Sequence, residues 1–161
     1  MSRPRTDVVL GINAFHGDSA AALLVGGHLV AAIEEERLTR VKHWAGFPRR
    51  AIETVLAEAR LTLGEVGHVA VSRDPSAHLL SRVLHAVRRL RAGDQIRNRI
   101  RNHGRIRNLE ALLRERVAGG REFAGEIHHV EHHHAHLASA FFCSPFENAA
   151  CLTVDGFGDF L

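Results

Sequence analysis

The sequence of 161 residues predicts an α/β fold, in which a mixed sheet is flanked by helices. Three observations support this prediction. The chain opens with three strand-like apolar runs, runs of strand and helix length then alternate, and polar side chains gather where the strands end. With 45% hydrophobic residues, a chain of this length can bury the core of one ordinary domain. We therefore expect a single domain.

The first three predicted strands form a meander. Asp7–Ile12 is an apolar run that ends in the polar segment Asn13–Ser19. Ala20–Val25 and His28–Ile33 are two further strands, and the dipeptide Gly26-Gly27 between them is typical of a tight hairpin. Antiparallel pairing of neighbouring strands is the arrangement that such short connections favour.

A charged run, Glu34–His43, follows the third strand and contains charges of both signs. Its simplest interpretation is a solvated surface loop. Arg40 and Lys42 lie where they could donate to a phosphate if this loop folds back over the strand ends. His16, after the first strand, could bind an anion together with backbone N–H groups of Gly11 and Gly17, although a plain turn is the simpler explanation there.

Helix-like and strand-like segments alternate after this run. Pro48 suits the first turn of a helix, and Val66–Val71 is a short apolar strand. Arg82–Arg116 contains eleven arginines, and leucines and valines recur among the first of them at helical spacing. An amphipathic helix with an arginine-rich outer face explains this pattern, so we expect no nucleic-acid partner. The core-facing positions after Pro48 are Ala51, Ile52, Val55, Leu56 and Ala59.

The histidine-rich segment near residue 132 contains the densest set of potential metal ligands. A strand at Glu126–Val130 leads into a helix in which His132 and His136, four residues apart, lie on one face and can bind one metal ion. A strand-like run, Ala149–Val154, then leads to Asp155, whose carboxylate could be a third ligand. The alternatives are an exposed polar helix start in a chain with 13 histidines, and a simple hairpin turn after the strand.

The predicted order is three strands, helix, strand, helices, strand, helix, strand. It matches an actin-like, ribonuclease-H-type half domain. In such sheets ligands bind at the strand ends, where His16, His132 and Asp155 are all expected.

Composition excludes several classes of protein. No run of 18 apolar residues and no secretory leader is visible, so we expect no membrane partner and a cytoplasmic location. Cys143 and Cys151 stand among apolar residues, which favours reduced, buried thiols.

Three segments, residues 11–21, 34–43 and 131–136, together resemble the O-carbamoyltransferases of nodulation-factor and antibiotic tailoring. These enzymes are similar to the catalytic subunit of the tRNA threonylcarbamoyladenosine synthase. The resemblance implies an actin-like domain that binds iron and a nucleotide. It also implies a second domain that makes carbamoyl adenylate from carbamoyl phosphate and ATP, and transfer of the carbamoyl group to a hydroxyl of a small-molecule acceptor.

Carried over by motif, the resemblance makes His132, His136 and Asp155 the metal ligands and His16 the catalytic histidine near the carbamoyl and phosphate groups. Ligand chemistry alone suits iron and zinc equally, and only the resemblance favours iron. The residues expected to contact ATP or carbamoyl adenylate are Lys42, Arg40, Gly156 and Gly158.

The family is several times longer than this chain. We therefore expect residues 1–161 to be the N-terminal half of an actin-like carbamoyltransferase domain, without its second half and without the adenylate-forming domain. We expect such a part to be inactive by itself. It is either a truncated product or one part of a split enzyme, whose remainder is encoded separately. The alternative is a non-catalytic metal- or RNA-binding module that uses the histidines and the arginine-rich helices.

Overall fold

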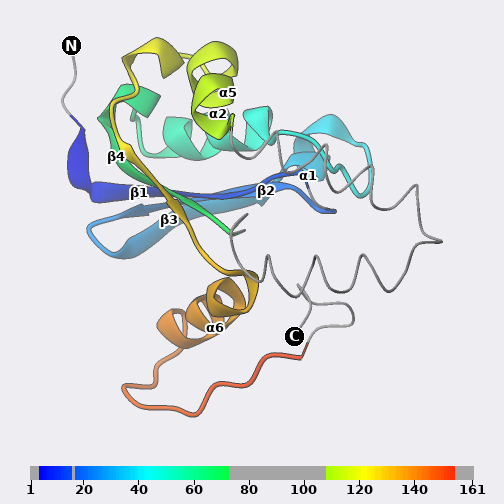
Figure 1. Ribbon diagram of the computed structural model, residues 1–161, viewed down its shortest axis with the longest axis vertical. Coiled ribbons are helices and arrows are strands. Elements are labelled where there is room, and N and C mark those ends of the chain that lie inside the picture. Colours follow the sequence, from blue (N-terminus) through cyan, green and yellow to red (C-terminus); the bar gives the residue numbers. More distant parts are fainter. Residues whose placement is uncertain (1–3, 16, 73–107, 155–161) are drawn as a thin grey trace, which may run out of the picture.

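The computed structural model describes residues 4–15, 17–72 and 108–154, and these form a mixed five-stranded sheet with helices on both sides (Figure 1). The sheet order is β3-β2-β1-β4-β5. Strand β1 is antiparallel to β2 and parallel to β4, β2 is antiparallel to β3, and β4 is parallel to β5. The strands are β1 (Arg5–Asn13), β2 (Ala20–Val25), β3 (His28–Glu34), β4 (Val66–Val71) and β5 (Glu126–His129). This is the predicted α/β, ribonuclease-H-like arrangement.

The three-stranded meander forms as predicted. Gly26 and Gly27 have φ angles of 58° and 80°, a left-handed conformation that glycine adopts without strain, and they close the hairpin between β2 and β3. In the pairing of β1 with β2, Leu10 lies opposite Leu23 and Ile12 opposite Ala21. All four of these side chains are buried, which fixes the register of the pair.

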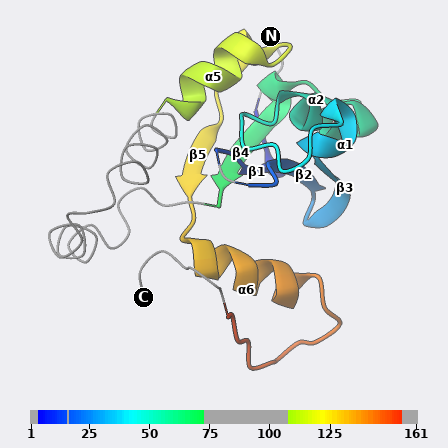
Figure 2. The ribbon, with the colours of Figure 1, turned by 90° about the vertical axis from the view of Figure 1, so that its right-hand side faces the viewer.

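One face of the sheet packs against two helices, α2 (Arg49–Glu58) and α5 (Leu109–Arg116). The helix predicted from Pro48 onward is α2. Figures 1 and 2 show α2 and α5 on one side of the sheet and α6 (His132–Phe142) on the other. The fully buried side chains of this core include Leu10, Leu23, Ile52, Val55, Val69, Leu109, Leu113 and Phe123.

The charged run after β3 is not a solvated loop throughout. It begins with the short helix α1 (Glu35–Thr39), and Glu35 is only 3% exposed. The Glu35 carboxylate accepts hydrogen bonds from the backbone N–H groups of Arg50 and Ala51, at 3.2 Å and 2.7 Å. These groups belong to the first turn of α2, where a helix has unpaired donors and favours negative charge. The prediction failed here because a charged side chain can be buried when it caps a helix.

Two glycines allow β1, β4 and the segment before β5 to approach closely. A Cβ atom added at Gly67 would lie 2.1 Å from the carbonyl oxygen of Arg5. One added at Gly125 would lie 2.4 Å from that of Val66. Neither position therefore accommodates a side chain without movement of the backbone.

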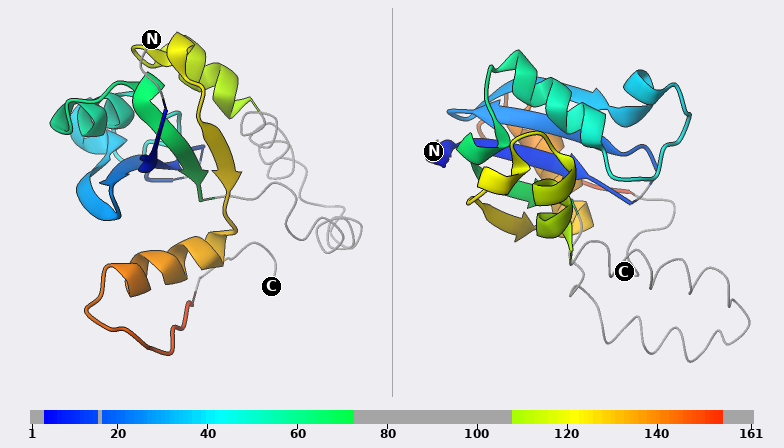
Figure 3. Two further views of the ribbon diagram at one scale, coloured as in Figure 1. Left: turned by 90° about the vertical axis from the view of Figure 1, so that its left-hand side faces the viewer. Right: turned by 90° about the horizontal axis from the view of Figure 1, so that it is seen from above.

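The segment after α6 differs from the prediction. Residues 149–154 form no strand, and Leu152 and Val154 are 88% and 87% exposed. A strand needs a neighbour that accepts and donates its backbone hydrogen bonds, and this segment lies beyond α6, apart from the sheet (Figure 3). Cys143 and Cys151 are exposed free thiols, so the expectation that both are buried is wrong.

Of the arginine-rich region, the structure describes only its last part. There α5 buries Leu109 and Leu113, and Arg114 forms an ion pair with Glu110 at 3.0 Å on the outer face. This part matches the predicted amphipathic helix, and the rest of the region lies outside the described residues. Within the described ranges, no helix has the length and apolar character that crossing a membrane would require.

Candidate functional site

The candidate site lies at the edge of the sheet where β1, β4 and β5 end. These three strands are parallel, so their carboxyl ends share one edge. Two backbone hydrogen bonds extend the pairing past the strand ends, from Ser72 N–H to Ile12 O at 3.3 Å and from Val130 N–H to Val71 O at 2.8 Å. Ligands of open α/β sheets bind at such an edge.

Helix α6 starts at this edge, and Glu131 is its N-cap. The Glu131 carboxylate accepts hydrogen bonds from the backbone N–H groups of His133 and His134, at 3.0 Å and 2.9 Å. Burial of this carboxyl group opposes its ionisation. The two backbone N–H groups and the His133 side chain outweigh that effect and lower the pKa of Glu131 to about 2. The start of α6 is thus fixed by a carboxylate that stays charged.

The two predicted metal ligands on α6 face each other. The Nε2 atoms of His132 and His136 are 3.1 Å apart, and their rings meet edge to face with centroids 4.5 Å apart. Bonds from a metal ion to imidazole nitrogen are about 2.0–2.1 Å long, so one ion can contact two nitrogens at this separation. The donor set therefore fits a divalent metal such as iron or zinc.

The two histidines between them lie elsewhere. His133 has a side chain only 12% exposed and contacts Glu131 through Nδ1 at 3.1 Å. His134 has a side chain 76% exposed. The helix thus separates the four histidines into a facing pair, one nearly buried ring beside the N-cap carboxylate and one largely exposed ring 3.7 Å from the same carboxylate.

The loop between β1 and β2 is shaped by Asn13. Its side-chain amide donates to the carbonyl oxygen of Asp18 at 3.1 Å, and Phe15 and Asp18 both have a φ angle of 60°. Gly11 lies within β1 opposite Ala22, so it takes no part in a loop that could bind an anion. His16 lies outside the described residues, and its assignment stays a prediction.

The basic loop after α1 is ordered by side chains to which the sequence assigned no role. His43 contacts Asp18 through Nδ1 at 3.0 Å, and its backbone N–H donates to the Glu36 carboxylate at 3.0 Å. Arg40 ends α1 with a φ angle of 61°, and both Arg40 and Lys42 are exposed. Whether either cation reaches the strand ends stays a prediction.

Asp18, Glu36 and His43 also form one of two described groups whose ligand atoms lie within 4.8 Å of one another. All three lie in residues 11–21 and 34–43, two of the segments that resemble the O-carbamoyltransferases. Their place in these segments is the sequence signal that could have identified them. Asp155, Gly156 and Gly158 lie outside the described residues. Whether Asp155 approaches His132 and His136 therefore stays a prediction.

The other group joins neighbouring strands. His68 Nδ1 on β4 lies 3.0 Å from His128 Nε2 on β5, and the Glu126 carboxylate lies 3.8 Å from the same His128 nitrogen. The buried neighbours of His68 on β4, Val69 and Val71, face α2 and α5, so this pair lies on the opposite face. Sequence reasoning missed it because its members are 60 residues apart.

Comparison with known proteins identifies relatives that match most of this chain. An uncharacterized protein of Synechocystis sp. is 38% identical over 169 residues, which cover 94% of this chain and 26% of that protein. The nodulation protein NolNO of Sinorhizobium fredii is 36% identical over 155 residues, which cover 92% of this chain and 21% of that protein. This chain therefore spans about a quarter of the length of these two relatives.

The sequence also matches the family described as the carbamoyltransferase N-terminus, over residues 8–161. The match includes every strand and helix of the fold from Val8 onward and both facing histidines of α6. The chain belongs to the carbamoyltransferase N-terminus family.

Proposed function

We propose that this chain is part of an enzyme that transfers a carbamoyl group from carbamoyl phosphate, through carbamoyl adenylate, to a hydroxyl of a small-molecule acceptor. The supporting observation is that a chain of the carbamoyltransferase N-terminus family places two imidazole nitrogens 3.1 Å apart where α6 leaves the carboxyl edge of the sheet. Because the reaction consumes ATP, we place the enzyme in the cytoplasm.

The proposed reaction has two stages. Carbamoyl phosphate, water and ATP first give carbamoyl adenylate, phosphate and pyrophosphate: water oxygen displaces phosphate from the carbamoyl carbon, and the resulting carbamate oxygen displaces pyrophosphate from the α-phosphorus of ATP. The acceptor hydroxyl oxygen then attacks the carbamoyl carbon, the bond from that carbon to the adenylate oxygen breaks, and AMP leaves. The hydroxyl proton must pass to a base during this attack.

In this proposal His132, His136 and Asp155 hold the metal, with iron as the first choice and zinc as the second. When bound, a metal ion offsets negative charge that develops on phosphate or acceptor oxygen. Glu131 orients the helix that presents the two histidines, because its carboxylate binds the first free N–H groups of α6.

The remaining roles fall to residues of the strand ends and loops. His16 donates a hydrogen bond or takes the hydroxyl proton near the carbamoyl group. Lys42 and Arg40 donate to phosphate oxygens from the loop after α1, and Gly156 and Gly158 bring backbone close to the nucleotide.

We further propose that residues 1–161 are the N-terminal half of an actin-like domain and are inactive alone. They span about a quarter of the length of the relatives, and a nucleotide pocket between two half domains needs both halves. The second half and the adenylate-forming domain would come from sequence beyond these residues or from a separately encoded partner.

The test compares two preparations, the 161-residue chain alone and the chain together with the remainder that its gene or a neighbouring gene encodes. Each receives carbamoyl phosphate, MgATP and a panel of sugar, phenol and aliphatic alcohol acceptors. Pyrophosphate release and mass spectrometry of the acceptors report the two stages separately. We expect both signals only with the remainder present.

Two outcomes contradict the proposal. Carbamoylated acceptor formed by the chain alone rules out an inactive part, and a completed protein that makes no carbamoyl ester with any acceptor argues against the transferase. His16→Asn in the completed protein should lower transfer while pyrophosphate release continues. His28→Asn, at an exposed position on β3, is the matched control and should change neither.

A further inference from the structure

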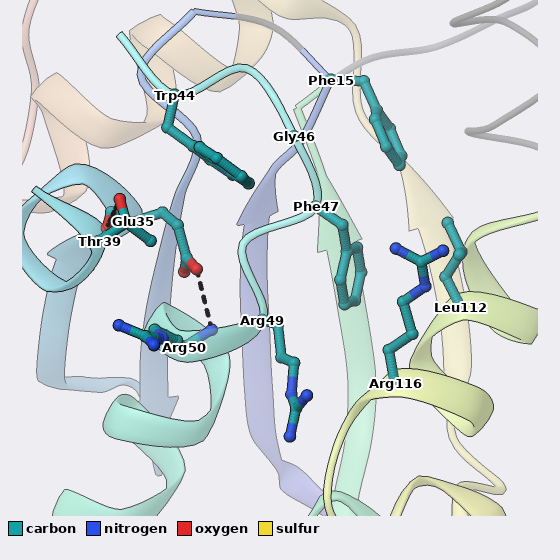
Figure 4. A pocket seen from close by; sticks show the side chains of 10 residues that line it. All are labelled: Phe15, Glu35, Thr39, Trp44, Gly46, Phe47, Arg49, Arg50, Leu112 and Arg116. Atoms are coloured by element: carbon teal, nitrogen blue, oxygen red, sulfur yellow. Dashed lines mark hydrogen bonds between the residues drawn. The ribbon is translucent and has the colours of Figure 1, made fainter. Parts of the chain in front are cut away.

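A cavity of about 750 Å³ lies on the face of the sheet opposite α6, between the loop before α2, the start of α2 and the end of α5 (Figures 1 and 4). Its volume is in the range of small-molecule sites, roughly 300–1,000 Å³. Three aromatic side chains border it, those of Phe15, Trp44 and Phe47, and Phe15 and Phe47 are buried. The cavity therefore offers flat apolar walls.

The indole N–H of Trp44 is buried and donates to no acceptor within the described part of the chain. Buried donors in proteins are nearly always paired, so an orphaned one indicates a missing acceptor. The glycine at position 46 makes room for this ring, because a Cβ atom there would lie 2.7 Å from the indole nitrogen. The sequence thus keeps a large aromatic side chain in a place where its polar atom has no partner among the described residues.

Three arginines also border the cavity, and their charges are balanced differently. Arg49 forms an ion pair with Glu53 at 3.0 Å. Arg50 donates through Nη1 to the carbonyl oxygen of Leu38, and its positive charge is offset by the buried carboxylate of Glu35 in the same cavity.

Arg116, from the last turn of α5, has no carboxylate partner among residues 4–15, 17–72 and 108–154. Nothing in these ranges accepts from its five guanidinium N–H donors, and the residue is exposed. Among the described residues, the cavity therefore holds one positive charge without a counter-charge, on a side chain whose planar fork suits carboxylate and phosphate oxygens.

We propose that this cavity binds an aromatic oxyanion, an aromatic ring that bears a phosphate or carboxylate group. The ring lies against Trp44 and Phe47, the charged oxygens pair with Arg116, and one acceptor oxygen takes the indole N–H of Trp44. Neither Arg116 nor the aromatic walls alone specify such a ligand, because an arginine binds any anion and an aromatic wall binds any ring. The combination selects molecules that have both parts. This inference does not rest on carbamoyl transfer.

The chain contains its own reporter for this test, since Trp44 is its single tryptophan and it has no tyrosine. Phenyl phosphate is titrated into the purified chain at physiological salt, where attraction between distant surface charges is screened, and the tryptophan emission is recorded. We expect a saturable change. Inorganic phosphate and benzyl alcohol, which each have one of the two parts, should bind at least about tenfold more weakly, as expected when one charge-assisted contact or one apolar contact is lost.

Two variants locate the binding. Arg116→Gln should weaken phenyl phosphate binding by about tenfold or more, whereas Arg121→Gln, an exposed arginine away from the cavity, should leave it unchanged. Trp44→Phe keeps a ring but removes the donor, and calorimetry should show weaker binding. Circular dichroism and thermal unfolding confirm that each variant is folded, and Arg116→Gln decides the question if Trp44→Phe does not fold.

Three results overturn the proposal. The first is no saturable binding by fluorescence or calorimetry. The second is inorganic phosphate binding as tightly as phenyl phosphate, which makes the cavity a site for simple anions. The third is equal weakening by Arg116→Gln and Arg121→Gln, which reduces the effect to net charge.

Discussion

Two pairs of facing histidines in this protein have nearly the same geometry and quite different origins. His132 and His136 lie on one helix, four residues apart, with ring nitrogens 3.1 Å from each other. His68 and His128 lie on neighbouring strands, 60 residues apart, with ring nitrogens 3.0 Å from each other. The first pair is set by the pitch of α6, whereas the second exists only while β4 and β5 keep their register.

The difference shows what each pair depends on. A shift of one residue between β4 and β5 would move His68 or His128 to the other face of the sheet and separate the rings. The same shift would leave the helical pair intact, because α6 buries none of its own residues against the sheet. The helical pair therefore depends only on local structure, whereas the cross-strand pair depends on the tertiary fold.

The largest expected effect acts on β4, the strand that carries His68 of the cross-strand pair. Gly67→Ala places a methyl group against the backbone of Arg5, so β1 and β4 must separate. We expect a loss of stability of roughly 1–3 kcal/mol or more, as for overpacked cores, measured by urea denaturation. Ser72→Ala, at the end of the same strand, should change stability far less. If Gly67→Ala left the stability unchanged, the close approach of β1 and β4 would be wrong.

The next effect concerns the helical pair. His136→Ala removes one of two facing ligands and should lower the affinity for ferrous iron or zinc by roughly tenfold or more, since even outer partners of metal ligands matter this much. His134→Ala removes a ring that points into solvent and should have little effect. Calorimetry under reducing conditions measures both. Equal losses would mean that the histidines bind metal as an unstructured patch.

The same contrast between local and long-range contacts explains which parts of the structure the sequence predicts. Local signals succeeded: the Gly26-Gly27 turn, the helix that follows Pro48 and the spacing of His132 and His136 each depend on a few neighbouring residues. The α/β class also followed, because the elements alternate in a pattern with few allowed topologies.

Features that depend on distant partners were missed. The cross-strand histidines gave no signal in the sequence. The charged neighbours of Glu35 in the sequence favour a solvated side chain, and the first turn of α2 explains why it is buried. Residues 149–154 have the composition of a strand, yet they have no adjacent strand in the described fold. His16 and Asp155 remain predictions, and so does the completeness of the metal site.

A smaller effect follows from the N-cap of α6. The pKa of Glu131 is lowered to about 2 from an ordinary value of 4.5, so its contribution to stability is fully present above pH 4.5 and disappears as the pH falls toward 2. Glu131→Gln should therefore cost about 1 kcal/mol at neutral pH, as N-caps do, and flatten this acid dependence. Hydrogen exchange of the α6 amides against pH measures it. Exchange of the β4 amides serves as the control and should not change.

The smallest effect is expected from the cross-strand contact itself. His128→Ala removes a half-exposed ring on an edge strand, so stability should fall by no more than about 1 kcal/mol. Metal affinity at His132 and His136 should stay the same. A larger loss would show that the pair on the sheet stabilises the fold and does not merely report it.

The buried carboxylate of Glu35 has a consequence for the loop that follows it. It joins α1 to the start of α2, and so brings together the two ends of residues 40–48. The middle of this loop is tied as well, because Phe15 N–H and the Ser19 hydroxyl both donate to the carbonyl oxygen of Gly46, at 3.1 Å and 2.9 Å. The entropy lost in ordering Lys42, His43 and Trp44 is therefore incurred when the protein folds. A ligand that meets this loop finds its backbone already in place, and less of the binding free energy is offset by ordering it.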